Sequence, residues 1–172
     1  PVGELEKLDK TNKTGTTITF KPDPEIFEKV EYKYETLAHR LQESAYLNKD
    51  LTLILTDKRK EDEKSEKFHY QGGIRAFVEF LNKDRNLINE NVIYFEKEID
   101  EYYLEVAIQY NEGFNERIYT YANNINTTEG RYHVTGFKTV SNQSVNNFAK
   151  KNNMLTKKVS SLRGSDVREG IT

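Results

Sequence analysis

Histidines, cysteines and paired carboxylates most often hold metals or move protons, and this sequence offers few of them in a usable pattern. The three histidines, His39, His69 and His133, form neither a His-Glu-x-x-His motif nor any other metal-ligand spacing. The chain has no cysteine, which excludes a disulfide, a thiolate nucleophile and a cysteine-ligated zinc. We therefore expect the histidines to be structural or surface residues, and we expect no metal site in this chain.

Motifs for phosphate binding and nucleophilic attack are missing from the sequence as well. It has no Gly-x-x-x-x-Gly-Lys loop, and Gly72-Gly73 is too short to cradle phosphates, so we interpret it as a tight turn between a strand and a helix. It also has no Gly-x-Ser-x-Gly elbow. No pair of its many acidic residues can be assigned acid and base roles from spacing alone. The sequence thus predicts no catalytic and no cofactor-binding residue within this chain.

The composition is that of one domain of ordinary size, with 172 residues, and its 9 Phe and 11 Tyr can supply a core. The net charge is −2, from 26 Lys and Arg against 28 Asp and Glu. Nucleic-acid-binding domains are usually basic, so any DNA contact here must be a local patch, weak by itself, or dependent on other domains.

Nothing in the sequence indicates a membrane or an export signal. No apolar run approaches the roughly 18 residues of a membrane span, and residues 1–13 are polar without an apolar signal core. The lack of cysteine is consistent with a cytoplasmic protein. Pro1 cannot directly replace an initiating Met, so we interpret it as the boundary of a fragment.

Hydrophobic periodicity predicts an α+β domain with helices on one face of a sheet. Strands are expected over residues 15–20, 51–56, 68–70, 92–95, 102–110 and 117–122, and helices over 34–45, 73–81 and 134–148, the last with Thr128 as a candidate N-cap. The highly charged stretch 57–67 is expected to be an exposed hairpin loop. Asn123 and Asn124 are expected to bond the backbone of a turn.

Six segments, in order along nearly the whole chain, carry a family resemblance. They are Thr14-Gly-Thr-Thr-Ile-Thr-Phe-Lys-Pro-Asp23, Leu37-Ala-His-Arg-Leu-Gln-Glu-Ser-Ala-Tyr-Leu-Asn48, Tyr70-Gln-Gly-Gly-Ile-Arg-Ala-Phe-Val-Glu-Phe-Leu-Asn82, Glu105-Val-Ala-Ile-Gln-Tyr-Asn-Glu112, Asn123-Asn-Ile-Asn-Thr127 and Asp166-Val-Arg-Glu-Gly-Ile-Thr172. Together they resemble the transducer domain of bacterial type II DNA topoisomerases, which is the second domain of DNA gyrase B and of the closely related topoisomerase IV protein ParE. Features that distinguish these two enzymes lie elsewhere.

The resemblance implies a fold similar to the second domain of a ribosomal small-subunit protein, with a mixed sheet, helices packed on one face and a left-handed βαβ crossover. It implies a polar lead-in from a preceding ATPase domain over residues 1–13 and a transducer domain over 14–172, ending before the family's Gln-Thr-Lys loop. In the family, the lysine of that loop reaches the γ-phosphate of ATP. ATP, its Mg and the catalytic residues are therefore expected outside this chain.

Family members line a cavity for the transported DNA duplex with basic residues after the Asn-Asn-Ile-Asn-Thr stretch. The family's Glu-Gly-Gly-Thr-His, Gly-Phe-Arg and Leu-Thr-Arg are here Glu129-Gly-Arg-Tyr-His133, Gly136-Phe137-Lys138 and Val140-Ser141-Asn142. Lys138 keeps a positive charge, Asn142 loses one and Arg131 introduces one, so Lys138 and Arg131 are the candidate DNA contacts. The alternative for both is a solvated surface charge, which is the favoured interpretation of Lys150, Lys151, Lys157 and Lys158.

The leading hypothesis is a mechanical module that couples ATP binding and hydrolysis in the preceding domain to DNA strand passage, whether supercoiling or decatenation. The expected partners are DNA, gyrase A or its topoisomerase IV counterpart, and a second copy of the full-length protein. The chain would then be an inactive fragment of an ATP-hydrolysing isomerase. A stand-alone RNA- or DNA-binding module of the same fold is the alternative, which the net charge of −2 disfavours. A MutL-like middle domain is disfavoured by the six segments.

Overall fold

The first 33 residues form a unit of their own in the computed structural model, which describes residues 3–4, 6–7, 9–127 and 132–172. The strand predicted over residues 15–20 is not formed, because these exposed residues have no ladder partner among the described residues. Alternating residues favour a strand, but only a neighbouring strand can bond its backbone. Local contacts order this unit: the Glu25 N–H donates to Asp23 Oδ1 at 2.9 Å, and the Phe20 and Tyr32 rings meet edge-on.

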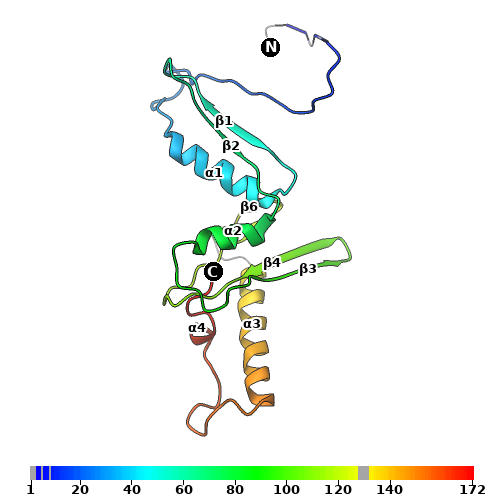
Figure 1. The fold of residues 1–172 in the computed structure, drawn as a ribbon, viewed down its shortest axis with the longest axis vertical. Coiled ribbons are helices and arrows are strands. Elements are labelled where there is room, and N and C mark those ends of the chain that lie inside the picture. Colours follow the sequence, from blue (N-terminus) through cyan, green and yellow to red (C-terminus); the bar gives the residue numbers. More distant parts are fainter. Residues whose placement is uncertain (1–2, 5, 8, 128–131) are drawn as a thin grey trace. The chain divides into compact units, whose positions relative to one another are not determined.

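The second unit, residues 34–172, contains the described helices and strands (Figure 1). In chain order they are α1 (Tyr34–Leu47), β1 (Leu53–Asp57), β2 (Lys64–Phe68), α2 (Gly73–Asn82), β3 (Ile93–Ile99), β4 (Tyr102–Ile108), β5 (Tyr121–Ala122), β6 (Ile125–Asn126), α3 (Tyr132–Lys151) and α4 (Gly164–Val167). None of the described helices is both long and apolar enough to cross a membrane. The domain boundary expected at residue 13 stays a prediction, while the two units meet at Lys33 and Tyr34.

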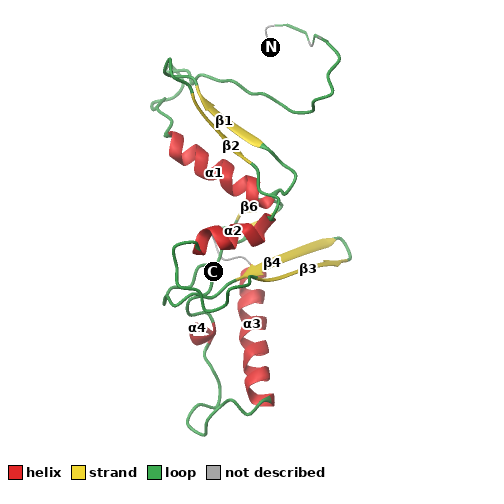
Figure 2. Ribbon diagram, in the orientation of Figure 1, coloured by secondary structure: helices red, strands yellow, loops and turns green. Residues whose placement is uncertain are grey.

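The α+β class is as expected, but the single mixed sheet is not found in the described part of the chain. Figure 2 shows short strands between the helices, and they pair as three separate antiparallel ladders, β1–β2, β3–β4 and β5–β6. Each ladder joins strands that follow one another in sequence through a short connection, which favours antiparallel hairpins over a parallel pair. Helices cover these ladders individually: α1 packs on β1–β2, and α2 packs on β4.

Two predicted strand boundaries near the charged stretch 57–67 are wrong. The β1–β2 ladder extends into that stretch from both sides, leaving residues 58–63 as the loop. Asp57 stands opposite Lys64 in the register, and such a cross-strand pair of opposite charge allows charged residues in an exposed ladder. The strand expected over 117–122 is likewise shorter, because only its last two residues pair with β6.

An aromatic cluster centred on Tyr46 joins α1 to α2. Its ring stacks on Tyr70, with centroids 3.7 Å apart, and on Phe77, with centroids 5.1 Å apart. Phe77 in turn meets Tyr119 edge-on at 5.8 Å. Nearby, the buried Glu43 accepts hydrogen bonds from Arg40 and from the Tyr121 hydroxyl. The apolar stripe predicted for residues 34–45 therefore leads into a core of packed rings.

The last three residues of the chain enter the centre of this unit as a backbone neighbour of the segment that follows β4. The Gln109 and Thr172 backbones exchange two hydrogen bonds of 2.9 Å, and the Asn111 N–H donates to the Gly170 carbonyl at 2.9 Å. Gly170 has a φ of +72°, and a Cβ there would collide with the Asn111 carbonyl oxygen. Glycine is thus required where the two backbones approach most closely.

Four buried polar side chains form hydrogen bonds at the same contact, between residues 170–172 and the segment that follows β4. Asn82, at the end of α2, is 1% exposed; its amide donates to Gln109 Oε1 at 3.0 Å, and its Oδ1 accepts from Thr172 Oγ1 at 2.9 Å and from Asn111 Nδ2 at 3.3 Å. The Gln109 amide donates onward to the Asn89 and Glu90 carbonyls at 3.2 and 3.1 Å. A buried amide is tolerated only when it is bonded in this way. We call these four residues (Asn82, Gln109, Asn111 and Thr172) the amide network.

We expect Asn82→Ala to lower the free energy of unfolding by about 2–4 kcal/mol, because it leaves buried groups of Gln109 and Thr172 without their partner. The matched control is Asn86→Ala, which removes an exposed amide bonded to Glu112 and should cost no more than about 0.5 kcal/mol. Urea unfolding of both variants measures the difference. Equal losses in the two variants would contradict a stabilising role for the amide network.

Candidate nucleic-acid interface

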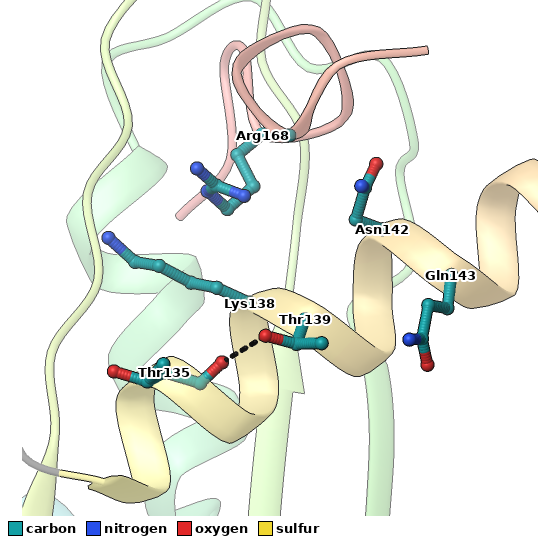
Figure 3. Close-up of a pocket in the computed structure, with 7 residues that line it drawn as sticks. Thr135, Lys138, Thr139, Asn142, Gln143 and Arg168 are labelled. Carbon is teal, nitrogen blue, oxygen red and sulfur yellow. Dashed lines mark hydrogen bonds between the residues drawn. The ribbon is translucent and has the colours of Figure 1, made fainter. Parts of the chain in front are cut away.

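One face of α3 carries a row of polar side chains. Thr135, Lys138, Thr139 and Asn142 are three or four residues apart, so they lie on the same side of the helix, and Thr139 Oγ1 donates to the Thr135 carbonyl at 2.8 Å (Figure 3). These residues line an open surface pocket of about 340 Å³, completed by Gln143, Gly164 and Arg168. The pocket therefore brings hydroxyl, amide and cationic side chains together.

Arg168 directly follows the short helix α4, and its side chain lines the pocket. At the two ends of α4, the N-cap Arg163 N–H donates to Asp166 Oδ2 at 2.8 Å, and the C-cap Arg168 N–H donates to the carbonyls of Gly164 and Ser165, each at 3.2 Å. A Cβ on Gly164 would lie 2.7 Å from Arg168 Nη1, so glycine leaves room for the guanidinium group. Figure 3 shows the Arg168 and Lys138 side chains on the same side of α3.

Glu116, in the segment after β4, joins these two cations. Its Oε1 lies 2.5 Å from Lys138 Nζ, and its Oε2 lies 2.7 Å from Arg168 Nε. The side chains of Lys138, Glu116 and Arg168 are 37%, 30% and 16% exposed, respectively, so the triad is partly screened by water. Two cations and one carboxylate leave one net positive charge at this end of the pocket. We call these three residues the charge triad.

The triad also sets the protonation of its carboxylate. Partial burial by itself raises the pKa of Glu116, but hydrogen bonds from Lys138 and Arg168 and the charges of both outweigh that effect and hold the pKa below its ordinary value. Glu116 is therefore a carboxylate at neutral pH. The two cations are held in place by an internal anion, and both line the open pocket.

Of the two predicted DNA contacts, the structure describes one. Lys138 lies in the pocket, while Arg131, like the candidate N-cap Thr128, lies outside the described residues. Asn142, where the family has a basic residue, lines the same pocket. The residue that the sequence reasoning missed is Arg168. Its signal was present, because it is the arginine of the Asp166–Thr172 segment that carries much of the family resemblance.

Of the three histidines singled out in the sequence, one is exposed and two lie within hydrogen-bond distance of an oxygen atom. His39 is exposed, His69 Nδ1 lies 3.2 Å from the Leu51 carbonyl, and His133 Nε2 lies 3.1 Å from Thr127 Oγ1. These surroundings fit a structural or surface role. Gly73 has a φ of +60° directly before the body of α2, as expected of a tight turn.

Asn123 and Asn124 form the turn between β5 and β6, each with a positive φ, which is the geometry that tight hairpin turns require. The prediction that their side chains bond the turn backbone needs correction for Asn124, and for Asn123 it stays a prediction. Asn124 Nδ2 instead donates to Asn48 Oδ1 at 2.8 Å, which ties the turn to the residue after α1. The four lysines 150, 151, 157 and 158 are exposed.

Comparison with known sequences gives a consistent set of relatives. A family model described as DNA gyrase B matches residues 73–172. The DNA gyrase B protein of Halalkalibacterium halodurans is 49% identical over 173 residues, covering 100% of this chain and 27% of that protein. That of Clostridium acetobutylicum is 48% identical over 169 residues, covering 98% of this chain and 26% of that protein. The chain thus spans about a quarter of the length of these relatives.

Solved structures show the same similarity. The 43K ATPase domain of Thermus thermophilus gyrase B, crystallised with an aminocoumarin, superposes with a TM-score of 0.72 at 34% identity, covering 88% of this chain and 41% of that chain. The gyrase B protein of Myxococcus xanthus gives a TM-score of 0.72 at 22% identity, covering 88% of this chain and 41% of that chain. At that identity the second likeness shows the fold alone.

Glu116→Gln tests whether the charge triad contributes to stability. Because folding lowers the pKa of Glu116, its carboxylate stabilises the folded state above the ordinary value of 4.5, and this contribution is lost as the pH falls through the lower folded-state value. We expect the variant to be about 0.2–1 kcal/mol less stable at neutral pH, with the difference shrinking as the pH falls below the ordinary pKa of 4.5. Urea unfolding across this range is the measurement, and a pH-independent difference would contradict the assignment.

Proposed function

Because this chain belongs to the DNA gyrase B family, we propose that it is the transducer part of a type II DNA topoisomerase. In this role it passes the effect of ATP binding and hydrolysis elsewhere in the full-length protein to the part that handles DNA, and so supports strand passage. The sequence match along the whole chain supports the proposal. ATP and Mg would bind outside this chain, whose sequence has no phosphate-binding loop.

The observation that carries the proposal is the way residues 170–172 lock distant segments together. Their backbone bonds to Gln109, Asn111 and Arg117, and Thr172 bonds to the end of α2. Packed elements tied in this way move as a body instead of deforming, which is what a transmitting domain needs. The left-handed βαβ crossover that the resemblance implies stays a prediction, because it requires two parallel strands and the described ladders are antiparallel.

Lys138 is the proposed contact with the transported duplex, and Arg131 is the second candidate. Lys138 is partly exposed and lies in a pocket with the Thr135 hydroxyl, two amides and a guanidinium group, which can donate to phosphate oxygens, while the Thr139 hydroxyl donates to the Thr135 carbonyl. The wider partners are proposed on the family relation alone: gyrase A or its topoisomerase IV counterpart, and a second copy of the full-length protein.

We expect Lys138→Gln in the full-length protein to weaken binding to duplex DNA and to lower the slope of log affinity against log salt by about one ion. DNA-stimulated ATP hydrolysis should fall in parallel. Fluorescence anisotropy at several salt concentrations and a coupled ATPase assay are the measurements. The matched control is Lys151→Gln, an exposed lysine at the end of the same helix, which should change neither quantity. Equal effects of the two variants would remove Lys138 as a specific contact.

By itself, this 172-residue chain should hydrolyse no ATP, because the proposal places the nucleotide site and general base in another part of the full-length protein. A sensitive phosphate-release assay, with the full-length protein as the positive control, provides the measurement. Turnover that disappears when a residue within this chain is replaced would overturn the proposal.

A further inference from the structure

The pocket on α3 has the side chains of an oxyanion-binding site, but both of its cations already form ion pairs with Glu116. Lys138 and Arg168 are its cations, and Thr135, Thr139, Asn142 and Gln143 add polar side chains around the same space. Arginine and lysine, together with hydroxyl and amide groups, are the usual protein ligands of DNA phosphates. Yet the Glu116 carboxylate already bonds both cations, at 2.5 and 2.7 Å.

We propose that Lys138 and Arg168 together bind one phosphodiester group of DNA, and that Glu116 is an internal counter-ion which the phosphate displaces from Lys138. This rests on the proposed contact between Lys138 and DNA and adds two residues to it. Arg168 becomes a second phosphate ligand. Glu116 becomes a residue that restrains DNA binding, because the phosphate must compete with a carboxylate already in place.

Backbone hydrogen bonds indicate which ion pair of the charge triad breaks when a phosphate binds. The Arg117 N–H, next to Glu116, donates to the Ile171 carbonyl at 2.9 Å, and the Ile171 N–H donates to the Arg168 carbonyl at 3.3 Å. The backbone of the buried Ile171 therefore fixes the positions of Arg117, next to Glu116, and of Arg168. Lys138 belongs to a different element, α3, and its ammonium group is on a flexible side chain. Lys138 is also the more exposed cation, 37% against 16% for Arg168. The pair of Glu116 with Arg168 is expected to persist when Lys138 turns to the phosphate.

Arg168 can contribute while it keeps this bond. Its contact with Glu116 uses Nε, and a guanidinium group carries five N–H donors in a fixed fork. The remaining donors are on the Nη atoms, and Nη1 borders Gly164, which lines the pocket. One guanidinium group can thus hold the carboxylate on one side and a phosphate oxygen on the other, which a lysine could not do with the same geometry.

The decisive variant is Glu116→Gln in the full-length protein. It keeps the size of the side chain but leaves both cations uncompensated, so the pocket gains one positive charge. We expect binding to a short fluorescein-labelled duplex at low salt to become about two- to fivefold tighter, the size of effect expected from one partly exposed ion pair, and the salt slope to steepen by about one ion. The matched control is Glu112→Gln, which makes the same charge change four residues earlier, at a carboxylate bonded to Asn86.

Glu112→Gln should change the affinity less than twofold, since a charge away from the phosphate is screened by salt. An increase for Glu116→Gln no larger than that of Glu112→Gln would overturn the counter-ion role. The double variant Glu116→Gln with Lys138→Gln should lose most of the gain. If Lys138→Gln alone weakens DNA binding while Glu116→Gln has no effect, this inference fails and the proposed DNA contact stands; if Lys138→Gln has no effect, the contact itself fails.

Two further arms test the second ligand and the nature of the anion. Arg168→Lys keeps the charge but removes the fork, and we expect about two- to fivefold weaker DNA binding with an unchanged salt slope; unchanged affinity would remove Arg168 as a ligand. In the other arm, inorganic phosphate is compared with chloride at equal ionic strength in the Glu116→Gln variant. Weaker duplex binding in phosphate than in chloride would show that the two compete for the pocket and supports the DNA assignment. Binding of inorganic phosphate, measured by calorimetry, that leaves the duplex affinity equal in the two salts would assign the pocket to free phosphate and overturn the DNA assignment.

Discussion

A buried amide destabilises a protein unless its donor and its acceptor both find partners, and this requirement governs the centre of residues 34–172. Asn82 and Gln109 are among the most deeply buried side chains of the described chain, and neither could be buried without the other. The Thr172 hydroxyl donates to the Asn82 amide oxygen, and the Thr172 backbone forms two hydrogen bonds with the Gln109 backbone. The position of the last residues is therefore not adjustable: they either occupy this place or leave several buried groups unbonded.

The same segment determines the geometry of the charge triad on the surface. Ile171 is bonded through its backbone to Arg117 and to Arg168, so the residues that carry Glu116 and the guanidinium group are spaced by a buried neighbour. Only Lys138 approaches from an independent element, α3. Residues 170–172 thus hold the Arg168 side of the pocket in place relative to the buried amide network, and Glu116 joins that side to Lys138 on α3. This arrangement supports the proposal that these elements move as one body.

Electrostatics explains how a chain with a net charge of −2 could make the proposed DNA contact. Net charge governs the long-range approach of a polyanion, but a bound phosphate responds mainly to charges within about one Debye length, roughly 8–10 Å. In the pocket the local balance is positive, since Lys138 and Arg168 share a single carboxylate. The balance is small, which fits the proposal of a weak contact that acts within the full-length protein.

The sequence by itself determined the local elements and the family. Apolar residues at helical spacing identified α1 and α2, alternation identified β4, and the resemblance of the ordered segments to the gyrase B family is confirmed. Periodicity records which face of an element is buried, and that is a local property. Only the tertiary structure decided how these elements pair: residues 15–20 form no strand, the ladders stay separate, and Arg168 meets Lys138 through Glu116. Hydrogen-bond partners and ion pairs join residues far apart in the chain, so no repeat in the sequence encodes them.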